Sequence, residues 1–514
     1  MIDVRAGRKL YIALTVCVIA IAAIFAAADG GEDTVRYHQH LEQPSEEELG
    51  ERPQSDGLVS HLPIVEIDTS QNGRYQDIPG RAIMDEDMNE VIGAVTGDDG
   101  ETDIEARIRT VEKEGRWHSL TDESDMESSM LIHVRGNSSR AFDKVNYRIK
   151  LTDEDDPLKS NDMPLLGMEK SSDWALHGPF LDKTLIRNYM WMNISAEIMD
   201  YTPAVRFCEL VIDGEYQGVY LMMETIEVAE ERLDLFPYEA GDPVMSYMVR
   251  IEPKAQLAKS VETFSFYTMK LEPDRQLEIA YPGARYQNEA VKDYIRNDFS
   301  QIEKALYSNE AGSDGDFYLE YLDEDSFVDY YIIQEFVGNN DTFQASTYFY
   351  KDVRGKLHIG PVWDYNNVLD NYTSVMPKEG FLISQSGFYS QLMKSERFVD
   401  RIISRYRELR KVILSDEYLT SYVEETEKWL GSAVDRNYQV WGYTWDWRNV
   451  PMYERRRPDT GSGETFDDVN PASYEEATEA MVDYMLDRGQ WLDRNIESLK
   501  QYCQVSRNAN TVLY

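Results

Sequence analysis

Apolar and polar residues alternate along much of the first half of the chain, which is the pattern of half-buried β-strands. The clearest case is the segment 144–151, in which Val145, Tyr147, Ile149 and Leu151 alternate with Lys144, Asn146, Arg148 and Lys150. Similar short runs occur at 62–67, 82–84 and 104–109. The pattern predicts that the N-terminal part of the folded body is rich in β-strands.

Two further strands are expected between Cys208 and Met223, because they flank Asp213-Gly214, a dipeptide that favours a tight hairpin turn. After Asp364 the apolar residues recur at helical spacing, as in the series Phe398, Ile402, Ile403, Tyr406, Leu409 and Ile413. We therefore expect an α+β fold, with a β-rich N-terminal lobe at about 61–235 and a mainly helical C-terminal part at about 236–505.

A second hairpin is predicted at 347–360, where two β-rich runs flank a glycine-containing turn. If Asp352 pairs near Leu357, residue 347 lies opposite about residue 362, because antiparallel partners sum to a constant. The segment before the hairpin predicts a helix that begins near Asp325 and ends at Gly338.

Asp341 and Asp364 flank one mouth of this hairpin, although they are far apart along the chain. Adjacent strands lie roughly 4.8 Å apart, so the two carboxylates could share a divalent cation or face one phosphoryl group. The competing interpretation is that Asp341 forms a turn and Asp364 caps a helix.

The N-terminus carries an uncharged apolar run from Leu10 to Ala28, preceded by the basic residues Arg5, Arg8 and Lys9. This pattern predicts a cytoplasmic stub at 1–9 and a transmembrane helix at 10–28, with the body outside the cytoplasm. A cleaved signal peptide is the alternative, and the protein would then be secreted. Residues 29–60 are acidic and poor in aliphatic side chains, so we expect a disordered linker there.

The 514 residues include 52 basic and 94 acidic side chains, which give a formal net charge of −42. Nucleic acid is excluded as a partner on this ground, because its phosphates would be repelled. Cys208 and Cys503 are expected to be free thiols, although a single bridge between them stays open. The seven histidines form no zinc-binding pattern.

In so acidic a chain, the cations on one face of the strand 144–151 require a reason. One interpretation is that this face points at phosphate groups, with backbone and hydroxyl donors supplied by the turn at 136–139. The other is a solvated edge strand, which commonly carries Lys and Arg.

Six blocks resemble, in order, the signatures of the spore-coat-protein-H (CotH) family of atypical kinases. They are Arg135–Ser139, Tyr147–Lys150, Asp182–Asn188, Gly214–Leu221, Asn340-Asp341 and Trp363–Tyr365, and the run Arg488–Asp493 resembles the closing helix of the family. The resemblance extends from about Leu62 to about Leu499.

The resemblance implies a reduced protein-kinase-like fold that binds ATP with Mg²⁺ or Mn²⁺ and transfers phosphate to Ser or Thr of an envelope or secreted protein. Asp341 resembles the catalytic aspartate, and Asp364 and Asn366 occupy the metal-holding positions. The nucleotide contacts implied are Arg135, Asn137, Ser138, Arg148 and Lys150, with Glu224 orienting the cation or the metal.

Two positions depart from the kinase pattern, because Ser346 replaces a metal-binding Asn and Asn366 replaces a frequent Asp. Each change removes ligand charge or field strength from a metal site. Two alternatives therefore stay open: a catalytically silent envelope or carbohydrate-associated binding protein on the same fold, and a metal-dependent hydrolase. The Asp182–Asn188 block begins a predicted helix with Asp182 as its cap, and Arg187 or Asn188 either reaches the nucleotide or fixes this helix.

Overall fold

The computed structural model describes residues 36–55, 57–84, 90–92, 102–113, 115–136, 138–252, 256–268, 277–307, 317–371, 376–450 and 465–503. The chain divides at His38 and Gln39 into two units, and the larger one, from Gln39 onward, contains the elements below. The predicted transmembrane helix at 10–28 lies outside the described residues. Within the described ranges, no helix combines the length and the apolar character that crossing a membrane requires.

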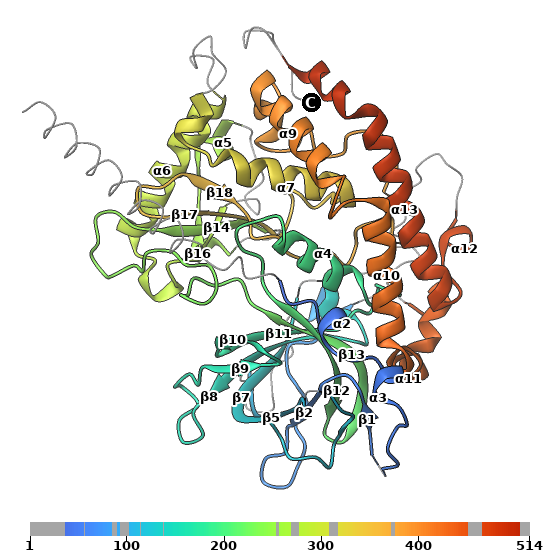
Figure 1. The fold of residues 1–514 in the computed structure, drawn as a ribbon. Coiled ribbons are helices and arrows are strands. Elements are labelled where there is room, and N and C mark those ends of the chain that lie inside the picture. Colours follow the sequence, from blue (N-terminus) through green and yellow to red (C-terminus); the bar gives the residue numbers. More distant parts are fainter. Residues whose placement is uncertain are drawn as a thin grey trace, which may run out of the picture. The chain divides into compact units, whose positions relative to one another are not determined.

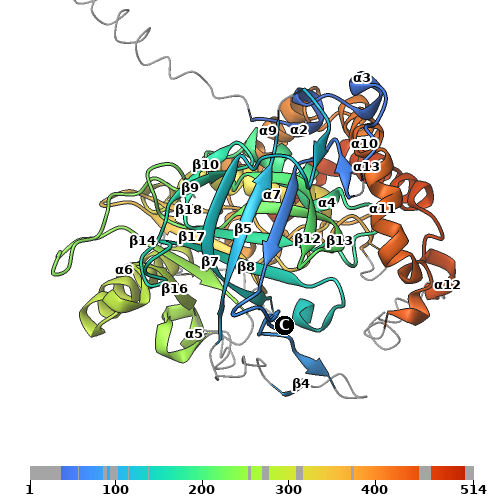
Figure 2. The same cartoon turned by 90° about the horizontal axis from the view of Figure 1, so that it is seen from below.

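Seven strands close into a barrel in the order β11-β13-β12-β2-β5-β7-β8, and Figure 2 shows β7, β5, β2 and β12 side by side. Only the β12–β2 pairing is parallel among these neighbours. Their bounds are β2 Ile64–Asp68, β5 Ile104–Val111, β7 Met126–Arg135, β8 Asn146–Thr152, β11 Asp173–His177, β12 Val205–Ile212 and β13 Glu215–Glu224.

The alternation of apolar residues explains the barrel core. Val65, Ile67, Ile149 and Leu151 are buried in one hydrophobic cluster, while Arg148 between them is exposed. The structure confirms the predicted strand at 146–151. The predicted place of Lys144 on the polar face of this strand is wrong, because Lys144 is buried and precedes the strand.

Lys144 is held inside the fold by two contacts. Its Nζ donates to Asn437 Oδ1 at 2.8 Å and lies 5.1 Å from the ring centroid of Tyr220. Burial lowers the pKa of Lys144 well below its ordinary value, because a low dielectric disfavours the ammonium form. Strand alternation does not extend to this residue because it precedes β8 and packs against the C-terminal helices.

The predicted hairpin at 208–223 is confirmed as the β12–β13 pair. Its two turn residues have positive φ, 52° at Asp213 and 81° at Gly214, which is what a type I′ turn demands. The Asp213 carboxylate also accepts hydrogen bonds from the backbone N–H and hydroxyl of Thr69, at 2.8 and 2.7 Å. The turn is thus fixed to the chain that follows β2.

A second sheet has the order β15-β16-β14-β17-β18. Its strands are β14 Tyr247–Ile251, β15 Ser260–Val261, β16 Leu277–Tyr281, β17 Thr347–Lys351 and β18 Leu357–Ile359. The predicted hairpin at 347–360 is confirmed, with Lys351 opposite Leu357 and Phe349 opposite Ile359. The register differs by one residue from the prediction, because Lys351 rather than Asp352 pairs with Leu357.

Helices make up most of the C-terminal half, as predicted. The longer ones are α4 Arg187–Ala196, α6 Glu289–Tyr307, α7 Glu324–Val337, α9 Glu396–Leu409, α10 Asp416–Leu430, α11 Ser432–Trp441 and α13 Tyr474–Asn495. In Figure 1, α10 and α13 lie side by side, and α11 packs on β13.

Short elements complete the described chain. They are α2 Gln39–Glu42, α3 Glu46–Leu49, α5 Phe264–Thr268, α8 Tyr389–Leu392, α12 Phe466–Val469, β1 Val59–Ser60, β3 Ile83–Met84, β4 Glu90–Ile92, β6 His118–Ser119, β9 Met163–Leu165 and β10 Met168–Ser171. Cys208 is buried and Cys503 half-buried, and both are free thiols, which confirms the prediction.

Helix α7 ends where the sequence predicts but begins earlier. Gly338 closes it in the left-handed conformation, with φ 68° and ψ 43°. The N-cap is Asp323, whose carboxylate accepts from the backbone N–H of Ser326 at 2.9 Å, so the predicted cap at Asp325 is wrong by two residues. Asp325 lies instead in the first turn of the helix, where its negative charge interacts favourably with the positive end of the helix dipole.

Part of the segment 29–60, predicted as a disordered linker, forms α2 and α3 and contacts the body. The side chain of Gln39 donates to the carbonyl oxygen of Phe207 at 3.1 Å and accepts from its N–H at 2.7 Å. Strand β2 pairs with β12 only from Glu209 to Ile212, so Gln39 takes the place of a strand partner for Phe207. The segment lacks a core of its own and uses polar groups of the body instead.

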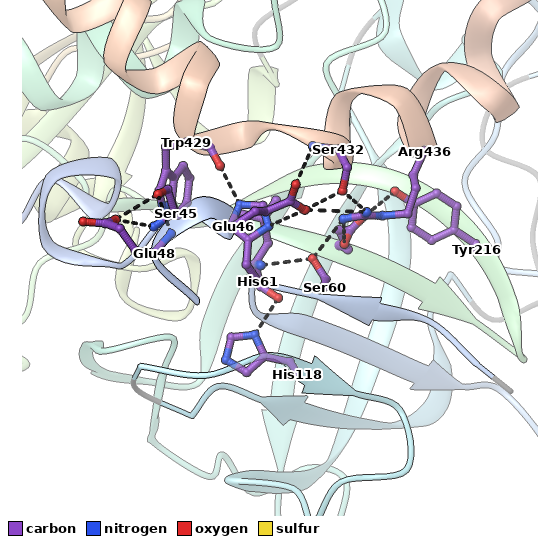
Figure 3. Close-up of polar contacts among 12 residues, drawn as sticks. Ser45, Glu46, Glu48, Ser60, His61, His118, Tyr216, Trp429, Ser432 and Arg436 are labelled. Atoms are coloured by element: carbon purple, nitrogen blue, oxygen red, sulfur yellow. Dashed lines mark hydrogen bonds and ion pairs between the residues drawn. The ribbon is translucent and has the colours of Figure 1, made fainter. Parts of the chain in front are cut away.

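Figure 3 shows how the same segment is held further on, around His61. Nε2 of His61 lies 2.6 Å from the carbonyl oxygen of Trp429, and Nδ1 lies 3.2 Å from Glu46 Oε1. The Glu46 carboxylate also accepts from the N–H of Ser432 at 3.2 Å and from its hydroxyl. Burial opposes ionisation, but hydrogen bonds from His61 and Ser432 lower the pKa of Glu46 to about 2.

A buried ion pair joins α7 to α13. Arg488 and Glu335 have side chains that are 0% and 2% exposed, and Arg488 also donates to the carbonyl oxygens of Lys378 and Gly380. Glu335 accepts from the N–H groups of Leu382 and Ile383. Both charges are therefore satisfied, and they fix the segment 378–383 between the two helices.

We expect Arg488→Ala to lower the free energy of unfolding by about 3–5 kcal/mol, because it leaves the Glu335 carboxylate buried without its partner. Chemical denaturation of the full-length protein measures this. Arg494→Ala is the matched control, since this exposed arginine on α13 only donates to Gln490 within its own helix. Equal destabilisation by the two variants would contradict the prediction.

Glu46→Gln should lower the thermal unfolding temperature at pH 7, because it removes the carboxylate that accepts from Ser432 and lies against His61. A lowered pKa in the folded state stabilises the fold above the ordinary pKa of 4.5, and this contribution is lost as the pH falls through about 2. The difference from the wild type should therefore shrink between pH 4.5 and 2. Glu47→Gln, at an exposed ion pair with Lys428, should show no such trend.

Candidate functional site

Asp341 lies in the turn that connects α7 to β17. Its backbone N–H donates to Asn339 Oδ1 at 3.0 Å, and its carbonyl oxygen accepts from the N–H groups of Gln344 and Ala345 at 2.7 and 2.8 Å. These bonds follow from the left-handed cap at Gly338, which turns the chain out of α7. Burial raises the pKa of the Asp341 carboxyl above its ordinary value.

Asp364 lies on the other side of the hairpin, in the loop after β18. Its φ is +68°, a left-handed conformation that is uncommon for a residue with a Cβ atom. The neighbouring Tyr365 is fully buried, and its hydroxyl lies 3.0 Å from Ser195 Oγ and 3.2 Å from Gln334 Nε2. The loop is thus anchored on α4 and α7, one residue from the carboxylate.

The two carboxylates interact electrostatically. Burial and then the charge of Asp341 raise the pKa of Asp364 to about 6, while Arg135 opposes the shift. Asp364 nevertheless keeps an exposed surface. Both properties fit a carboxylate on the wall of a cleft, which is surrounded by protein but open on one side.

Asn366 Oδ1 is buried and has no hydrogen-bond partner among the described residues. A buried acceptor without a partner is costly, and a bound ligand, water or ion would satisfy it. Within the described part of the chain, no three His, Cys, Asp or Glu side chains gather closely enough to hold a metal ion. Mg²⁺ in phosphotransferases often uses only one or two carboxylates together with substrate phosphates, so a site for this cation does not require three such side chains.

A cavity of about 590 Å³ opens between β7, β8 and the second sheet, and Trp363 contributes to its wall beside Asp364. Four arginines line it, namely Arg135, Arg140, Arg148 and Arg250, together with His133. Such a concentration of cations in a chain of net charge −42 favours an anionic ligand.

Gly136 is also part of the cavity wall. Its φ is +117°, and a Cβ atom there would lie 2.0 Å from Ser139 Oγ. Only glycine allows the chain to make this turn between β7 and the 3-10 helix at Ser138–Ala141. The backbone therefore approaches the cavity closely at this point.

Two of the predicted cationic residues have defined contacts. The Arg135 guanidinium lies 5.4 Å from the ring centroid of Trp363, which links the end of β7 to the Asp364 loop. Arg148 forms an ion pair with Asp173 on the adjacent strand β11, and its side chain is half exposed. Each arginine keeps N–H donors in a fixed fork that suits phosphate oxygens.

The other predicted nucleotide contacts are placed differently. Asn137 lies outside the described residues, and Ser138 begins the short helix after Gly136. Lys150 is half-buried on β8 and is not among the described residues that line the cavity. The Glu224 carboxylate accepts from the N–H of Ala204 at 2.8 Å and from the Tyr201 hydroxyl at 3.4 Å, which holds the ends of β12 and β13.

The sequence interpretation missed Glu252 and Arg250, which follow from the pairing of β14 with β17. Ile251 lies opposite Thr347, so Glu252 reaches Ser346, whose N–H donates to its carboxylate, and its charge also acts on Asp364. Arg250 forms an ion pair with Glu278 at 2.6 Å. This pairing joins segments that are far apart in sequence, and no motif marked residues 225–325.

The geometry can now be compared with known proteins. A search of curated proteins gave no match. The family model described as CotH kinase protein matches residues 132–492, which is more than half of the chain and includes the arginine-lined cavity, both carboxylates and the closing Arg488. The chain therefore belongs to the CotH kinase protein family.

Proposed function

We propose that the protein is a phosphotransferase that uses ATP and Mg²⁺ or Mn²⁺ to phosphorylate Ser or Thr of another protein. The observation that carries the proposal is that Asp364, on which the charge of Asp341 acts, directly follows Trp363 in the wall of an arginine-lined cavity. Phosphoryl transfer requires positive charge around the phosphates and a carboxylate that aligns the attacking hydroxyl. Membership of the family supports a kinase-like activity.

Each residue has a separate task in this proposal. Asp341 accepts the proton of the Ser or Thr hydroxyl, and its raised pKa makes it a stronger base than an exposed aspartate. Arg135 and Arg148 bind phosphate oxygens, with Arg140 and Arg250 along the same wall. The arginines hold the nucleotide in place and neutralise charge as the phosphoryl group moves.

Asp364 and Asn366 are the proposed ligands of the divalent cation, and Asp341 lies beside them. Asp364 supplies the charge, and the unpartnered Oδ1 of Asn366 supplies a neutral oxygen. A bound Mg²⁺ would neutralise phosphate charge in the transferring group. Lys150 and Glu224 have no task in this arrangement other than supporting the barrel strands.

The two sheets support, in our proposal, a reduced kinase-like architecture. The barrel of seven strands is the β-rich lobe, and the second sheet with its helices is the other. The cavity that contains Arg135 and Arg250 draws residues from both. Since the N-terminal run at 10–28 resembles a membrane anchor, we place this activity outside the cytoplasm, with an envelope or secreted protein as acceptor.

A silent binding protein on the same fold is the second candidate, and Ser346 favours it. Kinases have a metal-binding Asn at this position, whereas here Ser346 has φ +47° and its N–H is bound to Glu252. A weaker metal site would follow from the missing ligand. Transfer of labelled γ-phosphate from ATP to proteins of the source envelope separates the two candidates.

Asp364→Asn should lower the rate of this transfer by at least 100-fold. Of the two proposed metal ligands, Asp364 and Asn366, only Asp364 carries a charge, and the substitution removes it. Asp341→Asn should lower the rate by a similar factor while nucleotide binding persists, since general-base catalysis contributes about 10²–10⁴-fold. Asp370→Asn, in the same loop, is the control. Full activity of Asp364→Asn would refute the proposed role.

Metal affinity should fall as the pH drops below about 6. The carboxyl of Asp364 has its pKa raised to about 6, so protons compete with the cation at a pH where an ordinary aspartate, with pKa near 4, would still be ionised. Titration of Mn²⁺ by electron paramagnetic resonance between pH 5 and 8 measures this. An affinity that does not change until pH 4 would contradict the prediction.

A further inference from the structure

The block Asp182–Asn188 has no part in the proposed chemistry, yet it lies directly behind the Asp364 loop. Asn188, in the first turn of α4, is 2% exposed. Its Oδ1 accepts from the backbone N–H of Tyr365 at 2.7 Å, and its Nδ2 lies 2.9 Å from Nε2 of His177 on β11. The amide of Asn188 therefore bridges the barrel and the residue after Asp364.

This bond acts on a strained part of the backbone. Asp364 has φ +68°, and a non-glycine residue in such a strained conformation persists only where its surroundings impose it. The N–H of Tyr365 belongs to the peptide group that follows Asp364. An acceptor that fixes this group also fixes ψ of Asp364 and thus the direction of its Cα–Cβ bond.

Two further bonds from α4 hold the same loop. Arg187 Nε donates to the carbonyl oxygen of Val368 at 3.0 Å, and Ser195 Oγ lies 3.0 Å from the Tyr365 hydroxyl. Arg187 is itself fixed by Asp182, which accepts from its Nη1 at 2.7 Å and from its N–H at 2.9 Å. The helix thus contacts the loop on both sides of Asn366.

The orientation of the Asn188 amide follows from its neighbours. The N–H of Tyr365 can only donate, so the atom of Asn188 facing it is the oxygen, and Nδ2 must then face His177. Burial lowers the pKa of His177 to about 4, so its Nε2 is available as an acceptor at neutral pH. In this bridge the oxygen of the Asn188 amide is the acceptor for Tyr365, and its Nδ2 is the donor to His177.

We propose that Asn188 is a positioning residue of the metal site: it holds Asp364 in the strained conformation in which its carboxylate, with Asn366, receives the divalent cation. The proposal rests on the proposed function, because it assigns metal binding to Asp364. Neither Asn188 nor His177 contacts the cation or the nucleotide in this scheme. They act through the peptide group between Asp364 and Tyr365.

Direct Mn²⁺ binding to the full-length protein, measured by electron paramagnetic resonance without nucleotide, tests the proposal. Loss of an outer-shell partner typically costs 10–100-fold in metal affinity, and Asn188→Ala should show a loss in this range. Asn188→Asp keeps an acceptor oxygen for the Tyr365 N–H, so its affinity should lie within about threefold of the wild type.

The matched control is Asn193→Ala. Asn193 is a buried residue of the same helix, and its Nδ2 donates to the Tyr422 hydroxyl at 3.2 Å, away from the Asp364 loop. Thermal unfolding of both alanine variants shows how much each destabilises α4. If Asn193→Ala lowers the unfolding temperature as much as Asn188→Ala does and still binds Mn²⁺ with the affinity of the wild type, the proposal is supported.

Two outcomes overturn it in distinguishable ways. If the wild type binds Mn²⁺ and Asn188→Ala binds it equally well, the positioning role is wrong while the proposed function stands. If the wild type binds no Mn²⁺, the metal assignment of Asp364 is wrong and the positioning role falls with it. Should Asn188→Ala fail to fold, Asn188→Leu, which fills a similar volume without an acceptor, replaces it in the same comparison.

Discussion

The repulsion between two neighbouring carboxylates is the constraint on which the site depends. Burial raises the pKa of both carboxyls, and the charge of Asp341 adds to the shift at Asp364. The surrounding structure must therefore hold both loops in place without a cation. It does so through Gly338 at the end of α7 for one loop, and through Tyr365 packed between α4 and α7 for the other. The buried Arg488–Glu335 pair in turn fixes α7 against the closing helix.

The distribution of charge gives this site its chemical character. The chain carries a large excess of acidic residues, yet arginines from β7, β8 and β14 line one cavity next to the carboxylates. Most of these arginines have carboxylate partners, such as Asp173 for Arg148 and Glu278 for Arg250. Such pairs keep the guanidinium groups ordered, and ordered forks are better phosphate ligands than flexible lysines. Lys150, two residues further along the same strand, is not among the described residues that line the cavity.

The segment that precedes the barrel is part of the folded body, although its composition suggests otherwise. Gln39 completes the hydrogen bonds of β12 at Phe207, and Glu46 joins His61 to the start of α11. Polar residues can order a segment when a folded surface already offers unpaired partners, because the entropy cost is offset by bonds to that surface. A prediction of disorder from composition considers only the residues of the segment itself. It therefore misses contacts that the segment makes with the rest of the fold.

The local elements could be predicted from the sequence alone: the strand at 146–151, the two hairpins with their glycine turns, and the end of α7 at Gly338. These follow from periodicity and turn chemistry, which act over a few residues. Only the tertiary structure decided the barrel order, the burial of Lys144, and the approach of Glu252 and Arg250 to the site. It alone also showed that Asn188 accepts a hydrogen bond from the N–H of Tyr365. Each of these depends on contacts between segments far apart along the chain, and no local pattern encodes which segment a buried amide or carboxylate will meet.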